Sequence, residues 1–169
     1  MAKKILLISD THGSLPDQIQ KYARDCDEIW HAGDVGNSTV IVTLQHLKPL
    51  RAVYGNIDGA EVKAIFPENL IVDCEGVKVL MTHIGGSPSK IPTRVKQLLI
   101  AHKPNIFICG HSHIARVETM LQFGNCTYIN PGAAGNEGFQ KVKTIMLIEL
   151  DEGKIKSLKI VELGQRGTK

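Results

Sequence analysis

The chain has 169 residues, of which 43% are apolar and 22% charged, and it carries a formal net charge of +3 at pH 7. This composition is typical of a globular protein and excludes a wholly disordered, collagenous or membrane-spanning chain. Basic and acidic residues are interspersed and aromatic residues make up only 5%, so we expect no bulk nucleic-acid partner, which would need a basic stripe or an aromatic stacking platform.

The first apolar run is interpreted as a strand rather than a targeting signal. Lys3 and Lys4 precede it, but Asp10 ends the run before any signal-peptide cleavage site. No later stretch approaches the roughly 20 apolar residues of a membrane span. The cysteines are dispersed and form no Cys-x-x-Cys pair: Cys26, Cys74, Cys109 and Cys126. We predict a cytoplasmic protein with reduced thiols and no membrane partner.

Short apolar runs closed by Gly, Asn, Asp or Pro predict strands, and three stretches with a helical period predict helices. In chain order, the strands are expected at residues 4–9, 28–32, 51–54, 69–74, 77–82, 105–109, 116–123, 126–130, 143–150 and 154–162. The helices are expected at residues 15–24, 38–47 and 92–102. Ser14 is expected to cap the first helix, and Pro104 to stop the third. Hairpin turns are expected at Glu75-Gly76, Gly124-Asn125 and Glu152-Gly153.

This order of elements predicts an α/β protein with a β-rich second half. A βαβαβ segment is followed by a hairpin, one more helix and strand, and then mostly antiparallel strands. Two sheets packed face to face with the helices outside would bury these apolar faces. The chain has no internal repeat, low-complexity tract or linker. We therefore expect a single domain over residues 1–169, since domains typically run to about 100–200 residues.

Five of the predicted strands end in side chains that can bind metals. These residues are Asp10 and His12, Asp34, Asn56, His83, and His111 and His113. Any one alone would more often be a turn cap or a hydrogen-bonded polar group. Loops beyond the carboxyl ends of strands in open α/β sheets are where ligands bind, however, and five such loops together favour a site.

The chemistry of these side chains points to transition metals. The i, i+2 spacing of Asp10 with His12, and of His111 with His113, puts each pair on one side of an extended backbone. Nitrogen and oxygen donors without sulfur suit Mn, Fe, Co, Ni or Zn, and so much imidazole disfavours a dedicated Ca²⁺ or Mg²⁺ site. The set exceeds what one ion needs but suits two ions if one carboxylate bridges them.

The order of the motifs resembles the calcineurin-like metallophosphoesterase superfamily over residues 5–132. The motifs are Asp10-x-His12, Gly33-Asp34, Gly55-Asn56-x-Asp58, His83 and Gly110-His111-x-His113. The small size, Ile57 and the Asn130-Pro131-Gly132 segment resemble its compact phosphodiesterase branch, which also contains the retromer subunit of vacuolar sorting. The resemblance implies a four-layer α-β-β-α sandwich of two mixed sheets with a dinuclear metal site.

Position by position, the resemblance also implies ligand roles. Asp10, His12 and His113 would hold the first ion, Asn56, His83 and His111 the second, and Asp34 would bridge the two. The implied activity is metal-dependent phosphoester hydrolysis by a bridging hydroxide, with two divalent ions per chain. Mn is favoured among Mn, Ni, Fe, Co and Zn, and a small phosphodiester is favoured over a monoester as substrate. Asn56 is also a candidate substrate contact, and a homo-oligomer is left open.

Ile57 is the departure from the superfamily pattern. A histidine usually stands there and is credited with protonating the leaving group, whereas isoleucine has no proton to give. The general acid is therefore unidentified. Asp58 is expected to anchor the Asn56 loop through backbone hydrogen bonds, with support of catalysis as the other interpretation. His31 is assigned to structure because it lies inside a predicted strand.

Two other functions remain alternatives. One is a non-catalytic protein-binding scaffold resembling the retromer subunit, which the loss of the acid at Ile57 would favour. The other is a single-metal hydrolase acting on a substrate that is not a phosphate ester.

Overall fold

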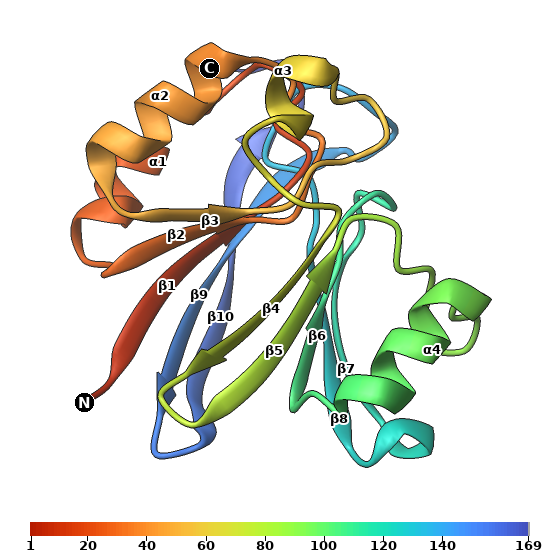
Figure 1. Ribbon diagram of the computed structural model, residues 1–169. Coiled ribbons are helices and arrows are strands. Elements are labelled where there is room, and N and C mark those ends of the chain that lie inside the picture. The colour runs from red at the N-terminus through yellow and green to blue at the C-terminus, as the bar shows by residue number, and fades with distance from the viewer. Residues whose placement is uncertain (169) are drawn as a thin grey trace.

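The computed structural model describes residues 1–168, which form two five-stranded mixed sheets with helices on their outer faces (Figure 1). The first sheet has the order β10-β9-β1-β2-β3, in which β1, β2 and β3 are parallel and β9 pairs antiparallel with both β1 and β10. Its strands are β1 (Lys3–Ile8), β2 (Glu28–His31), β3 (Leu50–Ala52), β9 (Val142–Asp151) and β10 (Lys154–Gln165).

The second sheet has the order β4-β5-β6-β8-β7, in which β5, β6 and β8 are parallel and the two edge strands antiparallel. Its strands are β4 (Asn69–Cys74), β5 (Val77–Thr82), β6 (Ile106–Ile108), β7 (Ala115–Met120) and β8 (Cys126–Pro131). The helices are α1 (Ile19–Arg24), α2 (Ser38–Leu47), α3 (Ala60–Lys63), α4 (Thr93–His102) and the 3₁₀ helix η1 (Leu121–Phe123). Helices α1 and α2 cover the first sheet and α4 covers the second, so the expected four-layer α-β-β-α sandwich is confirmed.

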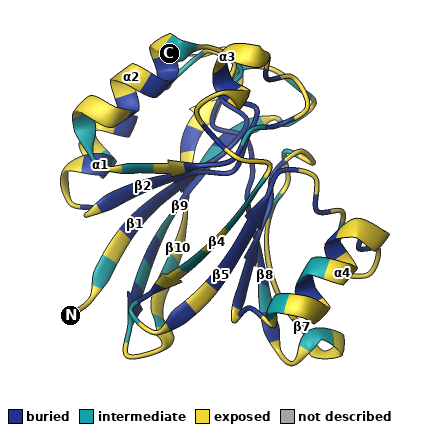
Figure 2. Cartoon of the chain, in the orientation of Figure 1, coloured by how far each residue is buried: buried dark blue, intermediate teal, exposed yellow. Residues whose placement is uncertain are grey.

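The alternation of side chains along the strands builds three cores between these layers. In β1, Ile5 and Leu7 face the second sheet, whereas Leu6 and Ile8 face α1 and α2. In β6, Ile106 and Ile108 lie between the sheets, while Phe107 packs under α4. Strands β2 and β6, whose two faces are both covered, are buried at every residue, and the centre of the fold is dark in Figure 2. The strand ends are therefore held by rigid packing on both sides.

The expected first helix is longer than the one observed. Helix α1 begins at Ile19, and its first turn is capped by no side chain, so Ser14 is not the N-cap. His12 and Gly13 form a turn instead, closed by the Ser14 amide, which donates to the Thr11 carbonyl at 2.9 Å, and residues 14–16 have no regular structure before a second turn at residues 17–18. This loop follows β1 directly and carries His12, which accounts for its irregular backbone.

Other differences lie at element ends. The predicted strand 116–123 ends at Met120, because residues 121–123 form η1 before the Gly124-Asn125 turn. Strand β3 spans 50–52 rather than 51–54, and β10 continues to residue 165 rather than 162. The four-residue helix α3 was not predicted, since it is too short to show a helical period. Within residues 1–168, no helix is long and apolar enough to cross a membrane.

Candidate metal centre

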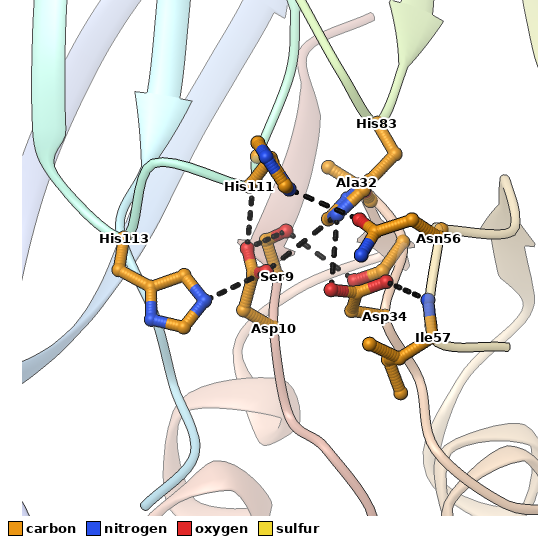
Figure 3. Close-up of polar contacts among 12 residues, drawn as sticks. Ser9, Asp10, Ala32, Asp34, Asn56, Ile57, His83, His111 and His113 are labelled. Carbon is orange, nitrogen blue, oxygen red and sulfur yellow. Dashed lines mark hydrogen bonds and ion pairs between the residues drawn. The ribbon is translucent and has the colours of Figure 1, made fainter. Parts of the chain in front are cut away.

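The seven residues predicted as ligands meet where the parallel strands of both sheets end, and all of them except His12 are labelled in Figure 3. Strand β1 is followed by Asp10 and His12, β2 by Asp34, and β3 by Asn56. In the second sheet, β5 is followed by His83, and β6 by His111 and His113. The donors form two groups, each with its donor atoms within 4.8 Å of one another: Asp10, His12 and His113, and Asp34, His83 and His111.

In the first group, one oxygen of Asp10 is fixed and the other faces the imidazoles. Asp10 Oδ2 accepts hydrogen bonds from the Ser9 hydroxyl at 2.6 Å and the His111 amide at 3.1 Å. Oδ1 lies 3.1 Å from Nε2 of His113 and 3.8 Å from Nε2 of His12. His113 Nδ1 donates to Oε1 of Gln140 at 2.8 Å, which leaves Nε2 as the nitrogen turned to the centre.

In the second group, too, one oxygen of the Asp34 carboxylate is held by a backbone amide and the other faces the imidazoles. Its Oδ1 accepts from the Ile57 amide at 3.0 Å. Its Oδ2 lies 3.1 Å from Nε2 of His83 and 3.4 Å from Nε2 of His12, and so stands between the two groups. His83 Nδ1 donates to the Ala32 carbonyl at 2.7 Å, so its Nε2 also faces the centre. One oxygen of Asp34 is thus placed to contact both groups.

Asn56 joins the second group through a different contact. Its Oδ1 lies 3.0 Å from Nδ1 of His111 (Figure 3). Asn56 and His111 are both exposed, whereas His83 and Asp34 are buried. The second group is therefore the side of the centre that is open to solvent.

Several of these donor atoms have no hydrogen-bond partner in the described part of the chain, which is the arrangement expected of atoms that bind a cation. Asp10 Oδ1, His12 Nε2 and His83 Nε2 are buried and have no hydrogen-bond partner among residues 1–168. A buried polar atom without a partner costs about 1–3 kcal/mol. Divalent cations between these atoms would satisfy them and would be held by the oxygen and nitrogen donors that transition metals take.

The electrostatics keep both carboxylates ionised. Burial alone would raise the pKa of Asp10, but contacts with His113, His12 and Ser9 and the charge of His83 hold it well below the usual range. Burial likewise opposes ionisation of Asp34, and contact with His83 lowers its pKa on balance. The pKa of His113 is raised by its contact with Asp10. Two buried, ionised carboxylates in one place call for positive charge between them.

The loops that carry the candidate ligands have a backbone conformation that residues other than glycine rarely adopt. Five of the candidate ligands have φ between 47° and 69°, in the left-handed region: Asp10, His12, Asp34, His111 and His113. Such residues cost of order 1–3 kcal/mol each and cluster at functional sites. Gly33 and Gly55 permit the close packing of these loops, because a Cβ on Gly33 would strike the His83 ring and one on Gly55 the Asp34 carboxylate.

Asp58 ties two of the ligand loops together. Its Oδ1 accepts from the Gly36 amide at 2.8 Å, and its Oδ2 accepts from the amides of Gly55 at 2.8 Å and Val35 at 3.1 Å. These are the backbone hydrogen bonds that the anchoring interpretation expects. Val35 and Gly36 follow Asp34 and Gly55 precedes Asn56, so one buried carboxylate fixes the spacing of two candidate ligands.

Asn130 supports the remaining loop, and His31 lies beneath the centre. Asn130 Nδ2 donates to the Gly110 carbonyl at 2.9 Å and the Ser112 hydroxyl at 3.0 Å, on either side of His111. His31 is fully buried, where its Nδ1 accepts from the Gly33 amide and its Nε2 contacts the Thr11 hydroxyl. Burial lowers the pKa of His31 to about 4, so it is a neutral structural residue at pH 7.

Two cavities adjoin the exposed side of the centre. The first, of about 270 Å³ and named here the Arg94 cavity, is lined by Tyr54, Asn56, Lys63, Thr82, His83 and Arg94, among others. The second, also of about 270 Å³ and named the Tyr128 cavity, is lined by Gly110, His111, Ile114, Arg116 and Tyr128, among others. Both share walls with the second group of donors. Neither Arg94 nor Gln140 is marked by a local motif, so the sequence did not point to them.

The family is decided by comparison with known proteins. The model of the calcineurin-like phosphoesterase superfamily domain matches residues 4–153. The chain belongs to this superfamily. This family is one of phosphoric ester hydrolases, and the chain has two groups of residues whose donor atoms suit divalent metal ions.

Three known proteins illustrate what the chain is similar to. A probable metallophosphoesterase of Methanothermobacter thermautotrophicus is 28% identical over 138 residues, 75% of this chain and 74% of that protein. A solution NMR structure of a Thermotoga maritima protein is 29% identical, with a TM-score of 0.73, covering 95% of this chain and 99% of that one. Vps29 of Entamoeba histolytica complexed with Zn²⁺ has a TM-score of 0.74 at 17% identity, covering 95% and 98%.

Proposed function

We propose that this chain is a metal-dependent phosphodiesterase with a dinuclear site. The observation that carries the proposal is the position of Asp34 Oδ2 between the two donor groups, 3.1 Å from Nε2 of His83 and 3.4 Å from Nε2 of His12. Asp10, His12 and His113 would hold one ion, Asn56, His83 and His111 the other, and Asp34 both. Bound divalent cations would supply the charge that activates a water molecule and neutralises phosphoryl oxygens.

The charge of the ligands suits a phosphate anion. Asp10 and Asp34 offset only half the charge of two divalent cations, and Asn56 adds a neutral oxygen that cancels none of it. The site therefore stays positive where the substrate binds. We favour Mn²⁺ because imidazole and carboxylate donors suit it, with Ni, Fe, Co and Zn as other candidates. The zinc complex of the Entamoeba relative is consistent with a transition metal here.

The preference for a diester has two supports. A diester has two arms, and the Arg94 and Tyr128 cavities adjoin the same donor group. Ile57 is 45% exposed beside Asp34 and has no proton to donate. The alcohol must then leave as an unprotonated anion, so the rate depends on how stable that anion is. Diesters with good leaving groups are the class that such a site hydrolyses best.

The test is hydrolysis of bis(4-nitrophenyl) phosphate by chelator-stripped protein with and without Mn²⁺. Asp34→Asn should lower the rate at least about 100-fold and release at least one ion by elemental analysis, since a neutral amide bridges poorly. Asp17→Asn is the matched control, because Asp17 is an exposed carboxylate outside the centre. An Asp34→Asn variant with two tightly held ions and the parent's rate would remove Asp34 from the mechanism.

A protein-binding scaffold is the second candidate, favoured by apolar residues around the centre. Ile57, Ile84 and Ile114 each directly follow a candidate ligand and are 45%, 40% and 65% exposed. Exposed large apolar residues near one another often mark interaction surfaces. If the protein binds two Mn²⁺ ions but hydrolyses neither diesters nor monoesters, the scaffold is the better proposal.

A further inference from the structure

The Arg94 cavity lies where one arm of a substrate bound at the centre would extend. Two of its walls, Asn56 and His83, belong to the second donor group, and Thr82 directly precedes His83 at the end of β5. Arg94 reaches the cavity from the first turn of α4, and Lys63 from the last residue of α3. Residues from several layers of the fold thus converge on a space next to the reacting position.

Arg94 is held in place by neighbours that leave part of its guanidinium unused. Its Nη1 donates to Oδ1 of Asn69 at 2.7 Å, and its Nη2 donates to the hydroxyl of Thr82 at 3.1 Å. Thr82 is fully buried and itself donates to Asn69, so the anchor is rigid. A guanidinium has five N–H donors, and the Arg94 side chain is 42% exposed. The guanidinium group of Arg94 is therefore fixed in position and still has N–H donors that a ligand can use.

The charges around the Arg94 guanidinium favour an anionic ligand. The carboxylate that approaches Arg94, that of Glu68, lies 3.9 Å away and is 51% exposed, which is a loose surface pair of little strength. Lys63 adds a second cation, held with its Nζ 5.2 Å from the centroid of the Tyr54 ring. The lining thus has two cations against one carboxylate that can move aside.

We propose that the Arg94 cavity binds an anionic group, a carboxylate or a phosphate, on one arm of the phosphodiester, and that Arg94 determines this specificity. The inference rests on the proposed phosphodiesterase function. Arginine suits the role because its planar fork pairs with two oxygens of a carboxylate or phosphate at once. The substrate class is then a diester in which one alcohol carries a further negative charge, with the other alcohol left to the Tyr128 cavity.

The kinetic test compares diesters that share one leaving group. The Mn²⁺-loaded protein is given 4-nitrophenyl phosphates whose second alcohol is 2-carboxyethyl, propyl or choline, so that only the charge of the retained arm changes. The parent should prefer the carboxyethyl ester over the propyl ester and reject the choline ester. Arg94→Gln should raise KM for the carboxyethyl ester about tenfold and leave kcat, and both constants for the propyl ester, nearly unchanged.

Two further variants sharpen the comparison. Lys96→Gln removes the same charge from the same helix outside the cavity lining, and it should keep the parent's preference. Glu68→Gln removes the competing carboxylate and should lower KM for the carboxyethyl ester. Equal treatment of the three esters by the parent, or a uniform loss across them in Arg94→Gln, overturns the proposal.

A binding measurement separates this inference from the proposed function. Calorimetric titration of the Mn²⁺-loaded protein uses 2-carboxyethylphosphonate and propylphosphonate, which are not hydrolysed. The first should bind about tenfold more tightly, and Arg94→Gln should remove the difference while Lys96→Gln retains it. If the parent cleaves no ester, the phosphodiesterase proposal fails, and the titration still decides the Arg94 cavity. Equal binding of the two phosphonates refutes the anionic site.

Discussion

Asp58 should be the most sensitive residue of the centre that is not itself a candidate ligand. It is 3% exposed and accepts three backbone hydrogen bonds, from Val35, Gly36 and Gly55. In Asp58→Ala these three amides lose their acceptor. Val35 and Gly55 are buried, so water cannot replace the carboxylate there, whereas Gly36 is exposed and can bind water.

The magnitude follows from this difference in burial. A buried donor left without a partner costs about 1–3 kcal/mol, so two of them give about 4 kcal/mol of lost unfolding free energy for Asp58→Ala. In a chain of this length, each kcal/mol lowers Tm by about 2–4 °C, which predicts a fall of about 8–16 °C. Asp58→Asn should cost only about 1 kcal/mol, because the amide oxygen can still accept from the buried amides of Val35 and Gly55 and only the hydrogen bond from the Gly36 amide is lost.

Urea unfolding of chelator-treated protein measures these losses. Asp27→Ala is the matched control, since Asp27 is exposed and accepts a single backbone hydrogen bond, from Lys4 at 2.8 Å; it should cost less than about 1 kcal/mol. Because Asp58 fixes the spacing of the loops that carry Asp34 and Asn56, Asp58→Ala should also weaken Mn²⁺ binding about 10- to 100-fold. A loss no larger than that of Asp27→Ala, with unchanged Mn²⁺ affinity, would refute the anchoring role.

Three further predictions concern the ions, pH and the leaving group. Mn²⁺ at 100 times its dissociation constant should stabilise the stripped protein by about 2.7 kcal/mol per independent site, seen as a rise in Tm; the double variant His111→Ala/His113→Ala should lose most of this rise, and identical titrations would count against the metal site. The pKa of His31 is lowered to about 4 in the fold, against about 6.5 when unfolded. As pH falls, His31 is therefore protonated in the unfolded chain before it is protonated in the folded protein. The free energy of unfolding is lost as pH falls from 6.5 towards 4, by about 2.5 kcal/mol at pH 4.5. Urea unfolding of chelator-treated protein at pH 7 and 4.5 should show that His31→Gln lacks this part of the loss, and equal losses would mean that another group is responsible. Rates on a series of nitrophenyl and alkyl diesters should depend steeply on leaving-group pKa in the parent, and Ile57→His should flatten that dependence; a parent that cleaves alkyl esters as fast as aryl ones must have another proton donor.

Local sequence patterns predicted the elements that have a full period and a clear end. Helix α2 spans the predicted residues 38–47 because its apolar period is complete and the Asn37 side chain caps it, accepting from the Val40 amide at 3.0 Å. The same period misled at residues 15–18, where the loop that carries His12 turns instead of entering the helix. There the requirement of the site prevails over local propensity.

The candidate ligands could be predicted because each follows a strand and has a ligand-type side chain. The residues that support them could not. Gln140 contacts His113 across 27 positions, and Asn130 reaches Gly110 across 20. Arg94 lies on a helix face where an exposed arginine is ordinary. Their roles come only from the packing of segments that are distant in the sequence.

The centre combines costs that the rest of the fold must offset. Five candidate ligands have left-handed backbones, and two ionised carboxylates lie buried near each other. The rigid cores beneath the strand ends, together with the Asp58 hydrogen bonds, can hold such an arrangement, and a cation would turn the repulsion between Asp10 and Asp34 into attraction. Metal binding and folding stability should therefore be coupled. A substitution that loosens the loops, such as Asp58→Ala, should cost more stability when Mn²⁺ is present than when it is absent, because it also forfeits the free energy of binding.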